Sequence, residues 1–279
     1  MFDFNKVLAE SKAATKNKSL FAIVMGASGG GKSFLMGTLG VKTLYLYISG
    51  EAHGAESAAI TGGDLVNPYC LDYVDGKQLS PDDTYKHLRA VLQNVDAIKA
   101  AGFKAVAIDG AAELELIIRN SKDWAKRCIN EKGVHSNWEE SDATMDLLRY
   151  VVEDAKGLQR QIGCHVVMTS ILDVRAVGDN GEITDASPRL RGARVADFLL
   201  RQFDEVLVVG RLQSAEGQVG HRIQFLTKMT KTAKEMSGGI KLLNFAPRIT
   251  GVRAEDLPSI VAADLSIIAK AKATGTFEA

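Results

Sequence analysis

Several features that mark particular protein classes are missing from this sequence of 279 residues. Its three cysteines, Cys70, Cys128 and Cys164, lack zinc-type spacing, which favours structural free thiols in a reducing compartment over disulfides or a metal site. Lys plus Arg equals Asp plus Glu at 34 each, so any contact with DNA must come from a local patch. No apolar run approaches the roughly 18 residues that span a bilayer. We therefore expect a cytoplasmic protein without membrane contact.

What is present is the composition of a globular protein, with 46% hydrophobic and 24% charged residues. A chain of this length can bury a sizeable core in one large domain. We predict an N-terminal helix within residues 1–18, a core domain over 19–250 and a helical tail over 251–279. The sequence contains no internal repeat and no low-complexity segment.

Apolar runs and helical patterns alternate along the chain. The apolar runs predict strands at 19–25, 43–49, 104–109, 164–170, 205–211, 221–227 and 240–245. Amphipathic patterns predict helices at 80–102, 111–132, 139–162 and 193–202. This alternation indicates an α/β fold with a mostly parallel sheet flanked by helices. Residues 171–193 are polar and rich in turn formers, which predicts a long mobile loop with a functional role.

The stretch GASGGGKS follows the first strand directly and precedes an apolar helical segment. Its spacing matches the phosphate-binding P-loop, in which small residues let backbone N–H groups converge on phosphates. Lys32 would reach the β and γ phosphates and Ser33 would hold Mg²⁺. The alternative is a purely structural glycine turn. The predicted nucleotide-binding residues are Gly26, Ala27, Ser28, Gly29, Gly30, Gly31, Lys32, Ser33 and Phe34.

A second acid is needed to hold the magnesium water shell, and Asp109 stands at the end of a predicted strand. Its alternative role is to cap the helix that follows. Many ATPases place a catalytic glutamate directly after this aspartate, but here that position is Gly110. Our first candidate for activating water is Glu51, which follows the second strand. Glu113 and Glu115 are weaker candidates, because they fit a solvated helix face or the preference for acids at the start of a helix.

The spacing of the motifs narrows the class of P-loop protein. Lys32 and Asp109 are 77 positions apart, which fits ATPases that place an additional strand between the two motif strands. The sequence has no Asn-Lys-x-Asp motif, which a GTPase would use to recognise guanine. A small-molecule kinase needs an arginine-rich lid, and residues 171–193 could imitate one.

Five stretches resemble, in the same order, those of RecA-type recombinase ATPases, particularly the compact single-strand annealing ATPases of bacteriophages. The stretches are GASGGGKS, YLYISGEAH, AVAIDG, VVMTS and TKMTKTAK, and with their surroundings they cover residues 20 to 247. The resemblance implies a RecA-like core with antiparallel C-terminal strands. It also implies a phage-encoded ATPase in the host cytoplasm that uses ATP and Mg²⁺, forms a ring or filament of identical subunits, and handles single-stranded DNA in recombination or annealing.

The resemblance also assigns roles to individual residues. Thr169 or Ser170 would sense the γ phosphate, with ordinary strand-end hydrogen bonding as the alternative. Residues 171–193 would grip single-stranded DNA, with a solvated, salt-bridged loop as the alternative. The predicted DNA contacts are Arg175, Arg189, Arg191 and Arg194.

Two further positions extend the resemblance to a neighbouring subunit. Lys231 and Lys234 would reach the γ phosphate bound by the next subunit, or else they are exposed lysines of a hairpin. No tyrosine follows Glu51 closely enough to stack on adenine, so the base contact is unassigned. The alternative function is a P-loop ATPase or nucleotide switch that acts on a protein partner in packaging or remodelling, without DNA recombination.

Overall fold

The computed structural model of the chain describes residues 19–129, 133–177, 182–213, 219–224, 229–230, 261–262 and 264–274. Three predictions lie outside these residues: the N-terminal helix within 1–18, the strand at 240–245, and the turn that carries Lys231 and Lys234. Among the described residues, no helix is both long and apolar enough to cross a bilayer.

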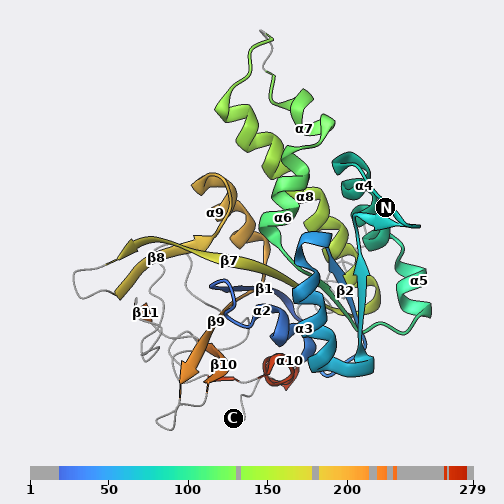
Figure 1. Cartoon of the computed structure of the whole chain (residues 1–279), viewed down its shortest axis with the longest axis vertical. Coiled ribbons are helices and arrows are strands. Elements are labelled where there is room, and N and C mark those ends of the chain that lie inside the picture. The colour runs from blue at the N-terminus through green and yellow to red at the C-terminus, as the bar shows by residue number, and fades with distance from the viewer. Residues whose placement is uncertain are drawn as a thin grey trace, which may run out of the picture.

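The predicted α/β fold with a mostly parallel sheet is confirmed (Figure 1). The sheet strands are β1 (Phe21–Gly26), β2 (Thr43–Tyr47), β3 (Val66–Cys70), β6 (Ala105–Ile108), β7 (His165–Val177), β9 (Glu205–Gln213), β10 (Val219–Gln224) and β12 (Val261–Ala262). Their order is β12-β10-β9-β1-β7-β6-β2-β3. All neighbours from β9 to β3 are parallel, whereas β10 and β12 are antiparallel to their neighbours. An additional strand, β7, lies between β1 and β6, as the motif spacing predicts.

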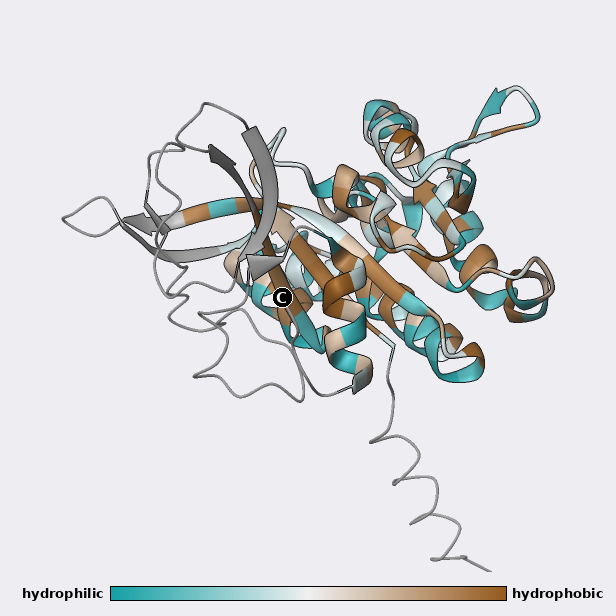
Figure 2. Cartoon of the chain, turned by 90° about the horizontal axis from the view of Figure 1, so that it is seen from below, coloured by the Kyte–Doolittle hydropathy of each residue, from teal (hydrophilic) through white to brown (hydrophobic). Residues whose placement is uncertain are grey.

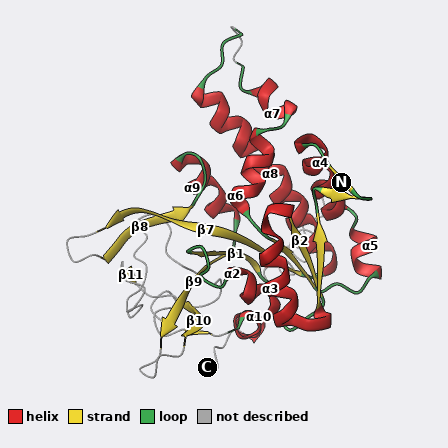
Figure 3. Ribbon diagram, viewed as in Figure 1, coloured by secondary structure: helices red, strands yellow, loops and turns green. Residues whose placement is uncertain are grey.

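Helices cover both faces of the sheet (Figure 3). They are α2 (Lys32–Gly37), α3 (Ala52–Gly62), α4 (Pro81–Gln93), α5 (Val95–Ala100), α6 (Ala111–Arg119), α7 (Lys122–Arg127), α8 (Asn137–Ile162), α9 (Ala193–Gln202) and α10 (Leu265–Thr274). The predicted helix at 80–102 is divided into α4 and α5, because Asn94 leaves the helical conformation (φ −82°, ψ 60°). The predicted helix at 139–162 begins two residues earlier, where Ser136 caps it, and ends as expected at Gly163.

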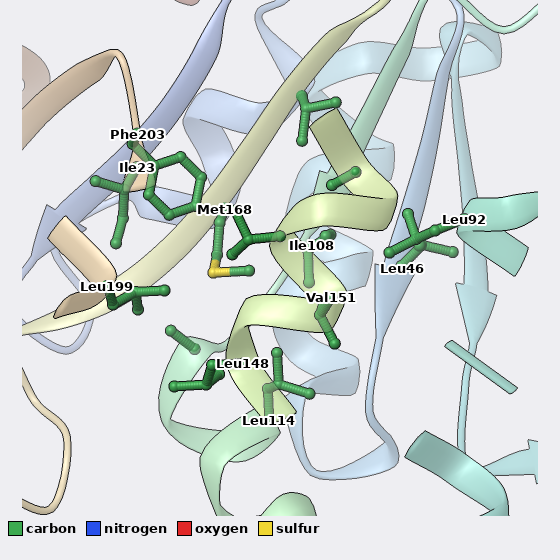
Figure 4. Packing of buried hydrophobic residues seen from close by; sticks show 14 of the residues in the cluster. Ile23, Leu46, Leu92, Ile108, Leu114, Leu148, Val151, Met168, Leu199 and Phe203 are labelled. Atoms are coloured by element: carbon green, nitrogen blue, oxygen red, sulfur yellow. The ribbon is translucent and has the colours of Figure 1, made fainter. Parts of the chain in front are cut away.

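Alternate residues of the central strands enter two separate cores, because both faces of the sheet are covered. On β1, Ile23 joins a cluster with α4, α6, α8 and α9, and Figure 4 shows it beside Phe203, with Met168 and then Ile108 further across the sheet. On the other face, Val24 joins a cluster with α2, α3 and α10. Figure 2 shows hydrophobic residues concentrated on the strands and on the helix faces turned toward them.

The predicted long mobile loop at 171–193 is wrong for most of its length. Strand β7 continues to Val177, and β8 (Glu182–Pro188) pairs with it in an antiparallel hairpin that extends past the sheet (Figure 1). The pairs Leu172↔Pro188 and Val174↔Ala186 fix its register. The segment 171–177 alternates apolar and polar residues and is rich in β-branched side chains, which favours a strand despite the turn formers that follow.

The sequence patterns predicted no helix or strand between the second strand and Ser80, but the structure has both in this region. Helix α3 and strand β3 complete the far side of the sheet. They are followed by a small hairpin of β4 (Tyr73–Val74) and β5 (Lys77–Gln78). Strand β3 contains Pro68 and polar residues, which hid it from the apolar-run criterion. As the edge strand of the sheet, β3 can accommodate a proline.

Helix α10 is held in place by a buried ion pair. Lys272 Nζ donates to Glu205 Oε1, and the two side chains are 6% and 0% exposed. The second oxygen of Glu205 accepts from Phe21 N at 2.9 Å, so the pair joins α10 to β9 and β1. Leu265 and Ile268 of the same helix are fully buried.

Removing the cation of this pair is expected to be strongly destabilising. In the Lys272→Ala variant the Glu205 carboxylate stays buried without its partner, which costs about 3–5 kcal/mol of unfolding free energy. Denaturant titration would measure the loss. Lys270→Ala, an exposed position on the same helix, should change stability by less than about 0.5 kcal/mol. Equal stabilities of the two variants would contradict a stabilising role for the pair.

Candidate functional site

The glycine loop connects β1 to α2 in the strand–loop–helix order that the motif requires. Gly29 and Gly31 have φ angles of 67° and 91°, which side chains disfavour, and Gly31 directly precedes α2. The Lys32 ammonium folds back over the loop and donates to the carbonyls of Gly26 (3.3 Å) and Ala27 (3.0 Å). Burial lowers the pKa of Lys32, while the carboxylates of Asp109 and Glu51 act in the opposite direction.

Asp109 lies beside this loop. It follows β6, is 4% exposed, and its Oδ2 accepts a hydrogen bond from Ser33 Oγ at 3.1 Å. Tyr45 OH also donates to Oδ2, and Thr169 Oγ1 donates to Oδ1. The alternative role of Asp109 as a helix cap is wrong, because Gly110 (φ 98°) occupies the cap position of α6 and no side chain caps that end.

Helix α3 passes very close to this pair. A Cβ atom at Gly54 would lie 2.6 Å from Asp109 Oδ2 and 2.8 Å from Ser33 Oγ. Any residue other than glycine at position 54 would force Asp109 Oδ2 or Ser33 Oγ to move. Neither Gly54 nor Tyr45 was predicted as a site residue, because neither lies in the glycine loop and neither is an acid at the end of a strand.

The oxygens of Ser33 and Asp109 are suitable ligands for Mg²⁺. This cation is usually held by one or two carboxylates together with waters and substrate phosphates. Within the described residues, no group of three or more His, Cys, Asp or Glu side chains could hold a metal ion. A single carboxylate beside a hydroxyl therefore fits a magnesium ion shared with a phosphate ligand better than a protein-enclosed metal.

Two glutamates converge beside Gly110. Glu51 ends a single 3-10 turn, η1 (Ser49–Glu51), and Glu113 lies in the first turn of α6. A Cβ atom at Gly110 would lie 3.1 Å from Glu113 Cγ and 3.7 Å from Glu51 Cγ, so the two side chains meet where Gly110 has none. Burial raises the pKa of Glu51, and the negative charges of Asp109 and Glu113 add to the effect.

Glu115 does not belong to this group. Its carboxylate is 6% exposed and accepts two hydrogen bonds from the backbone N–H of Arg191, at 2.8 and 3.0 Å. The predicted solvated helix face is therefore wrong at this position. Glu115 instead fixes the chain that leads into α9.

A cavity of about 390 Å³ joins these groups. It is lined by six of the predicted nucleotide-binding residues of the loop, Ser28, Gly29, Gly31, Lys32, Ser33 and Phe34, and by Ser170, a predicted sensor of the γ phosphate. The wall also includes Glu51, Glu113, Asp109, Thr169 and the exposed His53. The volume falls in the range of small-ligand sites, about 300–1,000 Å³. Ser170 Oγ donates to Ile171 O at 3.2 Å, and Thr169 accepts from Gly110 N at 3.0 Å.

The predicted DNA-binding arginines are spread along the β7–β8 hairpin and the start of α9. Arg175 belongs to β7, and its side chain lies outside the described residues. Arg189 is 3.9 Å from Asp173. Arg194 is 3.0 Å from Asp142 and lies over the ring of Trp138, 5.0 Å from its centroid. Arg189, Arg191 and Arg194 are all exposed.

Comparison with protein-family models and with curated proteins gives no match to this chain. The function is therefore inferred from the residues and geometry of the cavity.

Proposed function

We propose that this protein is an Mg·ATP-dependent ATPase with a RecA-like core. The observation that carries the proposal is the 3.1 Å contact between Ser33 Oγ and Asp109 Oδ2. These residues are 76 positions apart, yet the fold brings the last residue of the glycine motif to the carboxylate at the end of β6. A purely structural glycine turn does not require a contact between Ser33 and Asp109.

Each group in the cavity has a role in this proposal. Backbone amides of the loop and Lys32 would bind the β and γ phosphates. Ser33 and Asp109 would hold Mg²⁺, which when bound neutralises charge on the phosphate oxygens. Glu51 would orient a water molecule and accept its proton. Lys32 could exchange its hydrogen bonds to the carbonyls of Gly26 and Ala27 for bonds to phosphate oxygens.

We also propose that the core is RecA-like and that the substrate is single-stranded DNA. The position of β7 between β1 and β6 supports the assignment. Single-stranded DNA would contact Arg189, Arg191 and Arg194, which are exposed on neighbouring segments. A ring or filament of identical subunits would bring Lys231 and Lys234 to a neighbour's nucleotide.

A second candidate is an ATPase or nucleotide switch that acts on a protein partner. The carboxylates of Asp173 and Asp142, which accompany Arg189 and Arg194, favour it. These carboxylates would repel a phosphate backbone and reduce the attraction that arginines provide.

Phosphate release from ATP, measured with and without single-stranded DNA, separates the candidates. The proposed function predicts Mg²⁺-dependent turnover that DNA stimulates, and a Lys32→Ala variant that binds no nucleotide. Turnover that is indifferent to DNA would favour the protein-partner ATPase. Nucleotide binding without turnover in any mixture would favour the switch and contradict the proposed ATPase.

A further inference from the structure

The carboxylate of Asp72 accepts hydrogen bonds from the turn that carries Glu51. Asp72 is 6% exposed and lies in the connection between β3 and β4. Its Oδ1 accepts from Ser49 N at 2.7 Å and its Oδ2 accepts from Ser49 Oγ at 2.6 Å. Cys70 Sγ donates to Oδ1 at 3.2 Å. Both oxygens of this buried carboxylate therefore accept hydrogen bonds from Ser49, the first residue of η1.

Among the described residues, the exposed part of this turn has few other neighbours. Ser49 and Gly50 are exposed, and nothing lies within 4 Å of the position that a Cβ atom at Gly50 would occupy. The hydrogen bond from Glu51 N to Ile48 O, at 2.7 Å, shapes the turn but does not attach it to another element. The bonds to Asp72 thus join the start of the turn to the β3–β4 connection, while its end continues into α3, and Glu51 follows Ser49 by two positions.

The charge on Asp72 strengthens this attachment. Burial raises the pKa of its carboxyl, but the hydrogen bonds from Ser49 and Cys70 outweigh burial and lower the pKa below its usual value. An ionised acceptor makes hydrogen bonds that are shorter and about twice as strong as those between neutral groups.

We propose that Asp72 is a positioning residue that fixes Glu51 over the cavity through its two hydrogen bonds to Ser49. The inference rests on the proposed function, in which Glu51 acts on water. A positioning residue of this kind contributes to the chemical step and not to nucleotide affinity, because Asp72 does not line the cavity.

The test compares kcat at saturating Mg·ATP with the Kd of ATP. Asp72→Ala should lower kcat about ten- to hundredfold, the size expected when a reacting group is misplaced by about 1 Å. The Kd should change by less than about twofold. Ser49→Ala, at an exposed position, should lower kcat to a smaller extent, and Ser49→Thr, which keeps the hydroxyl, should restore it.

A double-mutant cycle distinguishes positioning from a general loss of structure. In a Glu51→Gln background, adding Asp72→Ala should cause no further loss of kcat, because the group it positions is already inactive. Additive losses would overturn the inference, as would normal kcat in Asp72→Ala beside an active unaltered protein. Absence of turnover in the unaltered protein would instead overturn the proposed function, and the inference with it.

Discussion

Glu51→Gln is expected to lower kcat for ATP hydrolysis by about 10²–10⁴-fold, the usual contribution of a general base. Glutamine has nearly the shape of glutamate but cannot accept a proton. ATP affinity should stay within a few-fold of the unaltered value, because the amides of the loop, Lys32 and Ser33 are unchanged. Single-turnover kinetics and equilibrium nucleotide binding would measure the two quantities separately.

Glu113→Gln is the matched control for this substitution. Glu113 lines the same cavity and meets Glu51 beside Gly110, so both variants lose one carboxylate at nearly the same place. We expect Glu113→Gln to reduce kcat far less than Glu51→Gln does. The reverse order would assign the base to α6 and show that our choice of Glu51 is wrong.

The second large effect is expected from adding one methyl group at Gly54. The new Cβ atom of Gly54→Ala would meet Asp109 Oδ2 at 2.6 Å and Ser33 Oγ at 2.8 Å, so at least one of these oxygens must move. We expect the Mg²⁺-dependent part of ATP affinity to be lost and turnover to fall about 100-fold, as for other misplaced groups. ATP titrations with Mg²⁺ and with EDTA would measure the change.

Gly157→Ala is the control for the Gly54 variant, because Gly157 also lies within a helix and its nearest neighbour would be 3.9 Å from the new atom. It should keep full turnover and gain about 0.5–1 kcal/mol of stability from the better helix former. An Mg²⁺ dependence unchanged in Gly54→Ala would mean that Ser33 and Asp109 do not share a metal.

Local signals in the sequence predicted the parts of the site that local chemistry defines. The glycine loop is recognisable by the spacing of its small residues between a strand and a helix, and Asp109 because an acid ends a buried strand. The spacing of the two motifs also predicted an additional strand between their strands, and the structure places β7 there. These predictions needed no knowledge of which residues meet across the fold.

The rest of the site depends on contacts between distant residues. Tyr45 is separated from Asp109 by 64 positions and looks in the sequence like any core residue of a strand. Gly54 matters only because α3 packs close to α2, which no local pattern reveals. Asp72 follows an edge strand that the apolar-run criterion missed. Without β3 and α3, the sequence could not indicate what surrounds Glu51.

Turn-forming residues led to the wrong prediction at 171–193. Gly, Asn and Asp cluster at 178–181, and the whole segment was predicted as a loop because of them. The structure pairs the two flanking segments as β7 and β8. The arginines assigned to a mobile loop are therefore attached to a hairpin and to a helix start, which limits how they can approach a ligand.

The attachment of α10 has a consequence for how the molecule assembles during synthesis. Leu265 N donates to Thr38 Oγ1 at 2.9 Å across 227 positions, directly behind the helix that begins at Lys32. Contacts of such long range form late, because most of the intervening chain must first leave the ribosome. Until residue 272 has emerged, the carboxylate of Glu205 has no lysine beside it and the hydrophobic underside of α2 is incompletely covered. A nascent chain at that stage would leave this apolar surface in contact with water.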